Sequence, residues 1–464
     1  MSKDKVIHAI EASKERFFWL AAEIWNQPEI SHQEQNSAGL QKAALHEFGF
    51  RVVELDEIQA HAFTAEFGSG QPVIGLLGEY DALPGLSQKL SAVQEPAVAG
   101  GPGHACGHNL LGTACLAAAT GIKAAIEAGH LKGTARYYGC PGEEQVGKPV
   151  LAKAGVFAGM DAALCWHPAD INTVAAYATN ATVTLAFRFK GMPSHAAQVP
   201  HLGRSALDAL TLMNVGVEFL REHMPQSARV HYVVTSGGER PNIVPSSAEG
   251  QFQVRSPRMR EVLPLVQRVI NVAKGAALMT GTEVEWEVLR GCYDVIPNSV
   301  ISDVLYDNMK GVPLPAFDAT DRDLASGLAA HFNDDQRRAT LAMFGIDPAT
   351  AATIIRSPLH QSVGYWGVGW TIPASTDVGD VSHLAPTAQI NTATWPVGVG
   401  SHTWQATAAS GSGIGMKGML YAAKVLAATA YDLMTRPDLL QKARAEFLAA
   451  TAGETYEPAK NLIK

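Results

Sequence analysis

The sequence predicts an α/β protein in which a large domain with a central mixed sheet is interrupted by a smaller, inserted α+β domain. Two observations carry this prediction. Short apolar runs alternate with helical stretches through residues 1–180, and a β-α-β-β-α-β order fills residues 181–294. The length agrees, because 464 residues correspond to two or three domains at roughly 150 residues each. With 47% hydrophobic residues, the chain has enough apolar material for a large core.

The first 180 residues show alternating helix and strand patterns. Helical periodicity in residues 5–48 breaks at NQPEISHQE, and strand-like runs follow at residues 61–68 and 73–85. A long apolar helix is expected from Leu110 to about Ala128. Two further strands are expected in GTARYYGCPGEEQ, which ends in a turn, and in GMDAALCWHP, which stops at Pro168. This alternation is typical of a layered domain built on one sheet.

Residues 181–294 have a different pattern. ATVTLAFRFKG alternates as a half-buried strand does, and SALDALTLMNVGVEFLREHM follows as an amphipathic helix. Two strands, a second helix and a final strand complete the segment, so an inserted domain with helices on one face of an antiparallel sheet is predicted. Residues 295–464 return to the first domain, with an irregular elaboration expected at 312–368.

Composition excludes several classes of function. The formal net charge is −8 and no basic stretch stands out, so no nucleic-acid partner is expected. The charged N-terminal segment is unlike a signal peptide, and no uninterrupted apolar run reaches the roughly 18 residues of a membrane span. We therefore expect a soluble, cytoplasmic protein with no membrane partner. The five cysteines are odd in number and need not pair in a reducing compartment, which leaves thiol and metal chemistry open.

The stretch GHACGHN, residues 103–109, places one thiol and two imidazoles within five positions. Three interpretations of Cys106 are open at this point. It could be a nucleophile with His104 or His108 as its base, a metal ligand beside His108, or a buried thiol without a chemical role.

Further candidate ligands recur where predicted strands end in loops, which is where sites form in open α/β sheets. The combined set offers a thiolate, three imidazoles and a carboxylate, and it comprises Cys106, His108, Glu144, His167 and His402. These donors suit Zn²⁺ or Mn²⁺, and five protein ligands suit two ions better than one. Glu143, beside a ligand, is then free to accept a proton from a metal-bound water whose pKa falls to about 7. A cysteine nucleophile would leave these carboxylates without a role.

Seven stretches, in this order, resemble one known family: GEYDALPG, GHACGHN, PGEEQVGKPVLAKAG, WHP, GMPSHAAQVPHLGRSALDA, NIVPSSAEGQFQVRS and SHTWQATAASG. They look like the dimetal metallopeptidases of the aminoacylase and glutamate-carboxypeptidase type. Within that family they resemble the amidohydrolase branch, which contains hippurate, auxin-conjugate and p-aminobenzoyl-glutamate hydrolases. The resemblance spans nearly the whole chain. It implies a catalytic domain that carries two divalent ions (Zn²⁺ or Mn²⁺, with Co²⁺ as a further candidate) and a smaller lid domain that makes a dimer.

The resemblance also implies a role for individual residues. The five candidate ligands match the family's metal ligands, and Glu143 matches its general base. His195 matches a lid histidine that reaches into the partner subunit's site to stabilise the oxyanion. Asn242 and Arg255 match lid positions associated with the polar tail of the substrate.

One stretch departs from the family pattern. Many members of the amidohydrolase branch have Asp-x-Asp where this chain has Glu79-Tyr80-Asp81. Asp81 fits a role in holding a ligand or the base in place. The resemblance assigns no role to Glu79.

The sequence therefore predicts a metal-dependent amidohydrolase that cleaves the amide bond of N-acyl or N-aroyl amino acids, with a p-aminobenzoyl-glutamate-like substrate favoured. The alternatives are a dipeptidase or a hydrolytic deaminase on the same scaffold and, more remotely, a non-catalytic binding protein, against which the intact Glu143 argues. A homodimer is expected. A hetero-oligomer with a related subunit is the alternative, because the p-aminobenzoyl-glutamate hydrolases work with a partner subunit.

Overall fold

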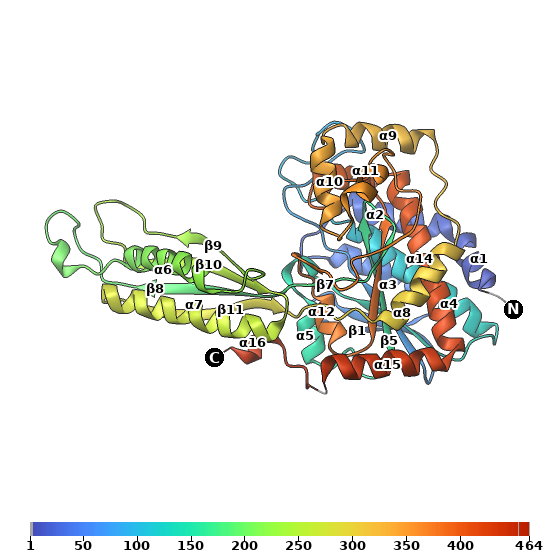
Figure 1. Cartoon of the computed structure of the whole chain (residues 1–464), viewed down its shortest axis with the longest axis horizontal. Coiled ribbons are helices and arrows are strands. Elements are labelled where there is room, and N and C mark those ends of the chain that lie inside the picture. The colour runs from blue at the N-terminus through green and yellow to red at the C-terminus, as the bar shows by residue number, and fades with distance from the viewer. Residues whose placement is uncertain (1–2, 453, 464) are drawn as a thin grey trace. The chain divides into compact units, whose positions relative to one another are not determined.

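The computed structural model describes residues 3–452 and 454–463 and divides into two compact units (Figure 1). The first unit comprises Met1–Ala178, Ile296–Ile372 and Val381–Thr455, and the second comprises Thr179–Val295, Pro373–Asp380 and Tyr456–Lys464. The predicted fold class is confirmed, since the structure has one large mixed sheet and a separate small antiparallel sheet. The second unit also includes two short later segments, although the sequence assigned all of 295–464 to the first domain.

The large sheet has eight strands in the order β1-β2-β4-β3-β5-β14-β6-β12. Their bounds are β1 Arg51–Glu54, β2 Phe63–Ser69, β3 Val73–Gly78, β4 Gly133–Gly139, β5 Ala162–Ala169, β6 Thr173–Ala175, β12 Gly364–Trp366 and β14 Thr387–Ala393. Strands β2 to β5 lie where the sequence predicted strands, whereas β14 was not predicted. Four neighbouring strands, β4, β3, β5 and β14, run parallel, so their carboxyl ends meet at one edge of the sheet.

A layer of helices packs on this sheet. α4 (His108–Glu127), α8 (Ser299–Gly311) and α14 (Gly413–Thr435) contact the central strands, and α14 contacts the other two helices. α1 (Asp4–Ala12) and α2 (Lys14–Asn26) cover α4, so the blue N-terminal helices and the red α14 belong to one packed unit in Figure 1. Further helices of this part of the chain are α3 Gln35–Glu47, η1 Glu143–Gln145, α5 Lys148–Lys153, α13 Trp404–Ser410 and α15 Pro437–Thr451, and α12 Val378–Ser382 spans the boundary of the two units.

Two helices, α4 and α7 (Met259–Thr280), are long and apolar enough to cross a membrane by length and composition. In α4, 83% of the most apolar window is buried in the core of the first unit. α7 buries one apolar face, including Val262, Val266 and Val269, in the core of the second unit. Both helices therefore contribute an apolar face to a core of the protein.

The expectation of an irregular segment at 312–368 is wrong. The segment forms α9 (Ala319–Ala329), α10 (Asp334–Ala342) and α11 (Pro348–Ile354), followed by β12. Each helix begins at a capping side chain, namely Asp318, Asn333 and Asp347. These caps satisfy the free N–H groups of the first turn and stabilise helices that are too short to show a strong apolar period.

The second unit confirms the predicted β-α-β-β-α-β order. Its elements are β8 Ala181–Lys190, α6 Ala206–Leu220, β9 Arg229–Ser236, β10 Ser247–Ser256, α7 and β11 Glu283–Cys292. The strands pair antiparallel in the order β11-β8-β10-β9, and α6 and α7 pack on the sheet over Phe187 and Phe252. Short elements complete the chain: η2 Pro200–Leu202, η3 Arg221–His223, α16 Ala459–Leu462, and the paired strands β7 Ala178–Thr179 and β13 Thr371–Ile372.

Candidate metal centre

The candidate residues of the first unit lie where the parallel strands end. β3 leads into Glu79 and Asp81, β4 leads into η1 with Glu143 and Glu144, β5 carries His167, β14 leads to the loop with His402, and α4 begins just after Cys106 with His108. Side chains that are far apart in the sequence thus share one edge of the sheet, as expected for a site at the carboxyl ends of strands.

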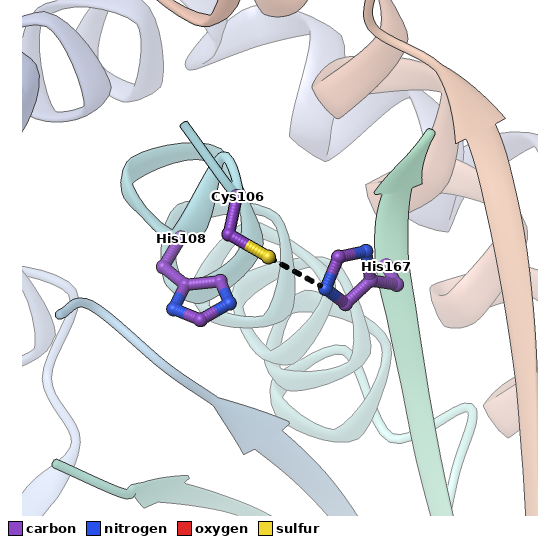
Figure 2. A group of neighbouring side chains, drawn as sticks. All are labelled: Cys106, His108 and His167. Carbon is purple, nitrogen blue, oxygen red and sulfur yellow. Dashed lines mark hydrogen bonds between the residues drawn. The ribbon is translucent and has the colours of Figure 1, made fainter. Parts of the chain in front are cut away.

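Gly107 allows two of these segments to meet. Its φ of 73° lies in the left-handed region, directly before the first residue of α4. A Cβ at this position would lie 2.8 Å from Cβ of Pro168, so a larger residue would push the turn away from β5. Figure 2 shows the result: Cys106 from this turn, with its Sγ 3.4 Å from Nε2 of His167, and His108 beside them.

The donor atoms form three groups, in each of which all atoms lie within 4.8 Å of one another. The groups are Cys106–His108–His167, Cys106–Glu144–His402 and Glu79–His108–Glu143. The first two contain all five predicted ligands and share the sulfur of Cys106. The thiolate of Cys106 has two imidazoles on one side and a carboxylate and an imidazole on the other. A thiolate placed in this way can bridge two divalent ions.

The separations within these groups match coordination geometry. Two N, O or S donors at 2.0–2.3 Å from one tetrahedral Zn²⁺ lie about 3.3–3.6 Å apart. Sγ of Cys106 is 3.4 Å from Nε2 of His167, and Nε2 of His402 is 3.3 Å from Oε1 of Glu144. The residues present therefore fit two ions of this class.

Hydrogen bonds fix the orientation of two imidazoles. Nδ1 of His108 donates to Oδ1 of Asp81 at 2.7 Å, and Nδ1 of His167 donates to the carbonyl oxygen of Pro168 at 2.7 Å. In both rings Nε2 therefore faces the centre, which is the usual arrangement for a ligating histidine. Nε2 of His108 is buried and has no hydrogen-bond partner among the described residues.

The electrostatics of the cluster favour cations. Burial would raise the pKa of the Cys106 thiol, but the charges of His167 and His108 and the hydrogen bond to His167 hold it well below its usual value. The thiolate in turn raises the pKa of His108 against the effect of burial. Hydrogen bonds to Cys106 and Glu144 raise the pKa of His402 to about 10. Divalent ions would displace the imidazole protons and neutralise the thiolate and carboxylates.

Asp81 connects three parts of the centre. Besides His108, its carboxylate accepts from Oγ of Ser31 at 2.7 Å and from the backbone N–H of Glu144 at 3.0 Å. Burial alone would raise its pKa, but His108 and these hydrogen bonds lower it to about 2. Asp81 is therefore an anion that orients one imidazole and the turn with the two glutamates.

Glu143 lies next to the ligands. Its Oε2 is 4.0 Å from Nε2 of His108, and its side chain is 11% exposed, whereas the side chain of His108 is fully buried. A carboxylate that borders both the ligands and the solvent side of the centre is suited to exchange protons there.

His104 lies outside all three groups of donor atoms. Its Nε2 donates to the carbonyl oxygen of Ile24 at 3.2 Å, and burial lowers its pKa to about 3. It is a buried, neutral histidine. The interpretation of Cys106 as a nucleophile with His104 as its base has no support, because this ring already hydrogen-bonds elsewhere.

Two side chains from the turn between α2 and α3 support the centre and were missed from the sequence. Besides the Ser31 contact, Oε1 of Glu34 accepts from the N–H of Gly142 at 2.6 Å. Gly142 has a φ of 71°, and a Cβ there would lie 2.4 Å from the ring of His32. Burial and the charge of Asp81 raise the pKa of Glu34 to about 7. In the sequence this turn was only an interruption between helices.

The loop that carries His402 is held by further residues that sequence analysis did not select. Arg337 on α10 donates from Nε to the carbonyl oxygen of Val397 at 2.9 Å, and Asp170 accepts from the N–H of Gly398 at 2.8 Å. The segment expected to be irregular therefore helps to place a candidate ligand.

The candidate residues of the second unit have different surroundings. His195 is exposed, and its Nδ1 accepts from the N–H groups of Ala197 and Gln198 at 3.3 and 3.2 Å. Asn242 lies beside it, since its carbonyl oxygen accepts from the N–H of Ala196 at 3.1 Å. Arg255 is on β10 and donates to Gln253 at 3.0 Å. The structure thus brings His195 and Asn242 together, while the described contacts do not link Arg255 to them.

The chain is similar to curated hydrolases over nearly its whole length. It is 41% identical over 457 residues to one of the subunits of the p-aminobenzoyl-glutamate hydrolase of Escherichia coli, and the match covers 97% of this chain and 95% of the relative. The chain belongs to the p-aminobenzoyl-glutamate hydrolase family of dinuclear metallopeptidases. The Xaa-Arg dipeptidase of Mus musculus is 29% identical over 470 residues, covering 96% of this chain and 92% of that protein. No family model matches the sequence.

Solved structures share the fold of this family member. An aminobenzoyl-glutamate utilization protein from Klebsiella pneumoniae superposes with a TM-score of 0.60 at 16% identity, covering 94% of this chain and 100% of the other. A dinuclear metal-binding peptidase from Bacillus subtilis superposes with a TM-score of 0.57 at 17% identity, covering 92% and 99%.

Family membership confirms the prediction of a metal-dependent hydrolase that acts on amide bonds. The donor groups around Cys106 agree with divalent metals as cofactors. The substrate, the identity of the metal and the role of each residue stay predictions.

Proposed function

We propose that this amidohydrolase releases the amino acid from an N-aroyl or N-acyl amino acid, with p-aminobenzoyl-glutamate as the favoured substrate. The similarity to a p-aminobenzoyl-glutamate hydrolase over 97% of the chain supports the substrate class. The observation that carries the chemistry is the pair of donor groups that share the sulfur of Cys106.

In the proposed centre, one ion is held by Cys106, His108 and His167, and the other by Cys106, Glu144 and His402. When bound, Zn²⁺ or Mn²⁺ polarises the substrate carbonyl and makes hydroxide available near neutral pH. Asp81 and Pro168 keep the lone pairs of two imidazoles directed at the centre through their Nδ1 contacts.

Glu143 does the proton transfer in this proposal. Its carboxylate takes a proton from the attacking water as the new C–O bond forms. It later gives this proton to the amide nitrogen, and the C–N bond then breaks to release the amine. Its neighbour Glu144 ligates instead, because its Oε1 is 3.3 Å from Nε2 of His402.

We further propose that His195 stabilises the oxyanion in the partner subunit's site. Its Nδ1 accepts two backbone N–H groups, so the ring proton is on Nε2 and is available to donate to an oxygen. Asn242 lies next to it and would bind the polar tail of the substrate together with Arg255.

A homodimer through the second unit is proposed for the same reason. β9 is an edge strand, and its Val233 and Val234 are 55% and 43% exposed. A hetero-oligomer is the alternative, because the other subunit type of the Escherichia coli p-aminobenzoyl-glutamate hydrolase is also a relative, 28% identical over 282 residues. We place the enzyme in the cytoplasm, where reduced cysteines such as Cys106 persist.

The test combines metal analysis with a substrate panel. The purified full chain is expected to hold two divalent ions, to lose activity on chelation and to recover it with Zn²⁺, Mn²⁺ or Co²⁺. The panel contains p-aminobenzoyl-glutamate, hippurate and dipeptides that end in arginine. The dipeptides are included because of the similarity to the Xaa-Arg dipeptidase. Preferential cleavage of dipeptides would replace the proposed substrate, and full activity in demetallated protein would refute the proposed chemistry.

A further inference from the structure

Glu79 is a buried carboxylate at the edge of the centre to which neither the sequence nor the proposed mechanism gives a role. It is 3% exposed, and its two oxygens have different neighbours. Oε1 is 2.5 Å from Nζ of Lys148, and Oε2 is 3.6 Å from Nε2 of His108. A carboxylate is taken out of water at a large cost unless charges or hydrogen bonds compensate both oxygens.

The contact between Glu79 and His108 is not a hydrogen bond. At 3.6 Å it is longer than an N–H···O bond, and Nε2 has no hydrogen-bond partner among the described residues. The separation instead equals that of neighbouring ligands on one ion, about 3.3–3.6 Å for donors at 2.0–2.3 Å. Because Nδ1 of His108 is hydrogen-bonded to Asp81, Nε2 is the ring nitrogen left for the donor group with Cys106 and His167. An ion on Nε2 is therefore within reach of Oε2 of Glu79.

Lys148 explains why the carboxylate is held in this direction. It is the first residue of α5, just after the turn with the two glutamates, and it is fully buried. Its ammonium group compensates Oε1 and leaves Oε2 directed at His108. Glu79 is also more buried than Glu143 and is tied to a cation, so it is poorly placed to exchange protons as a base.

We propose that Glu79 is a sixth protein ligand of the metal centre, binding the ion held by His108, and that Lys148 is the residue that positions it. This inference rests on the proposed two-ion centre and extends its ligand set. The added ligand is a hard oxygen donor on an ion that otherwise has a thiolate and two imidazoles. Carboxylates suit Mn²⁺ and thiolates suit Zn²⁺, so Glu79 is expected to increase affinity for Mn²⁺ more than affinity for Zn²⁺.

The test measures metal binding by the full-length protein, demetallated and then titrated with Mn²⁺ or Zn²⁺ against a competing chelator. The wild type is expected to bind two ions. Glu79→Gln should bind one of them about 100-fold more weakly, with the larger loss for Mn²⁺. The metal affinity of Lys148→Met should fall about 10-fold, which is in the range found for residues that orient a ligand. Glu79→Asp keeps a carboxylate at this position, where many family members have aspartate. Its affinities for both metals should stay close to those of the wild type.

The matched control is Asp321→Asn. Asp321 is also a buried carboxylate of the first unit with a lysine partner, Lys417, and it lies outside the donor groups. Its removal should leave both affinities unchanged even if the melting temperature falls.

Wild-type affinities in Glu79→Gln would overturn the inference and leave Glu79 as a structural partner of Lys148. If Glu79→Gln does not fold, metal binding by Lys148→Met and by Glu79→Asp tests the inference instead. Wild-type metal affinity in Lys148→Met, or a loss of affinity in Glu79→Asp as large as that expected for Glu79→Gln, would contradict the inference. A wild-type protein that binds fewer than two ions would instead refute the proposed centre itself.

Discussion

The metal centre in the first unit and the candidate residues of the second unit are built in contrasting ways. In the first, side chains from four strand ends and one helix start lie close together, most of them buried or half-buried and His402 exposed, and hydrogen bonds fix the orientation of several. In the second, His195 and Asn242 are exposed and are held mainly by backbone contacts. The first arrangement places the candidate metal ligands and the proposed base Glu143 together within one unit. In the second arrangement the side chains of His195 and Asn242 are exposed to solvent. A side chain that acts on another subunit has to be exposed in this way.

The largest effect should come from the residue that moves the proton. Glu143→Gln should lower turnover by about 10²–10⁴-fold or more while the metal content stays near two ions, because the amide cannot accept the proton. Glu144→Gln is the matched control and should lose metal along with activity. Equal loss of metal in both variants would show that the two neighbouring glutamates do not divide the work as proposed.

His195→Ala should lower turnover by about 10²–10³-fold, the range for loss of one oxyanion donor, with unchanged metal content. Mixed with Glu143→Gln under conditions that allow subunit exchange, it should regain activity. A mixed dimer then has one site with both lesions and one site with neither. A mixture that stays inactive, with exchange confirmed by mass spectrometry of tagged subunits, would show that His195 acts within its own chain or not at all.

Asp81→Asn should weaken metal binding by about 10–100-fold, because Asp81 orients His108 and the backbone of Glu144. Titration of the demetallated variant with Zn²⁺ measures this loss. Ser31→Ala removes a single hydrogen bond to the same carboxylate and should cause a smaller loss. If Asp81→Asn binds both ions as the wild type does, Asp81 does not orient the ligands.

The last expected effect is on stability and concerns a buried acid in each unit. Burial raises the pKa of Asp170 to about 7 and that of Asp380 to about 8. In the unfolded chain both would titrate near about 3.9. Each group therefore contributes stability that is fully present below about pH 4 and is lost as the pH rises to the folded pKa, by at most about 1.4 kcal/mol per pH unit.

Melting temperatures of the demetallated protein between pH 4 and 8 measure this effect. Asp170→Asn and Asp380→Asn should each flatten the decline with rising pH. Asp380 has the higher folded-state pKa of the two acids, so its contribution should extend the decline in melting temperature to about pH 8. The same slope in wild type and variants would show that these acids do not titrate as the structure indicates.

Local patterns in the sequence predicted much of the fold. The apolar helix that became α4 and the strands β2 to β5 have strong periodicity, and so do the elements of the second unit. β14 was missed because TAQINTA, a central strand, lacks a long apolar run. The helices of 312–368 were missed because their caps, such as Asp318 and Asn333, carry more of the signal than their apolar faces.

Four candidate ligands, Cys106, His108, Glu144 and His167, lie next to a predicted strand or helix start, whereas the strand before His402, β14, was not predicted. The supporting residues could not be selected from the sequence. Ser31 is 50 positions from Asp81, Lys148 is 69 from Glu79, and Arg337 is 60 from Val397. Such contacts depend on how the strands and helices pack, and no local spacing encodes them. A buried lysine has no sequence signature that distinguishes it from an exposed one.

The shared sulfur is the central claim, and Cys106→Ser tests it most directly through the metal content of the purified protein. If Cys106 joins both ions, the variant should retain fewer than one ion per chain, because each of the two donor groups loses a ligand. Cys165→Ser, at a buried cysteine outside the donor groups, should retain two. A Cys106→Ser protein that is inactive but still holds two ions would contradict the account and would favour a nucleophilic role for the thiol.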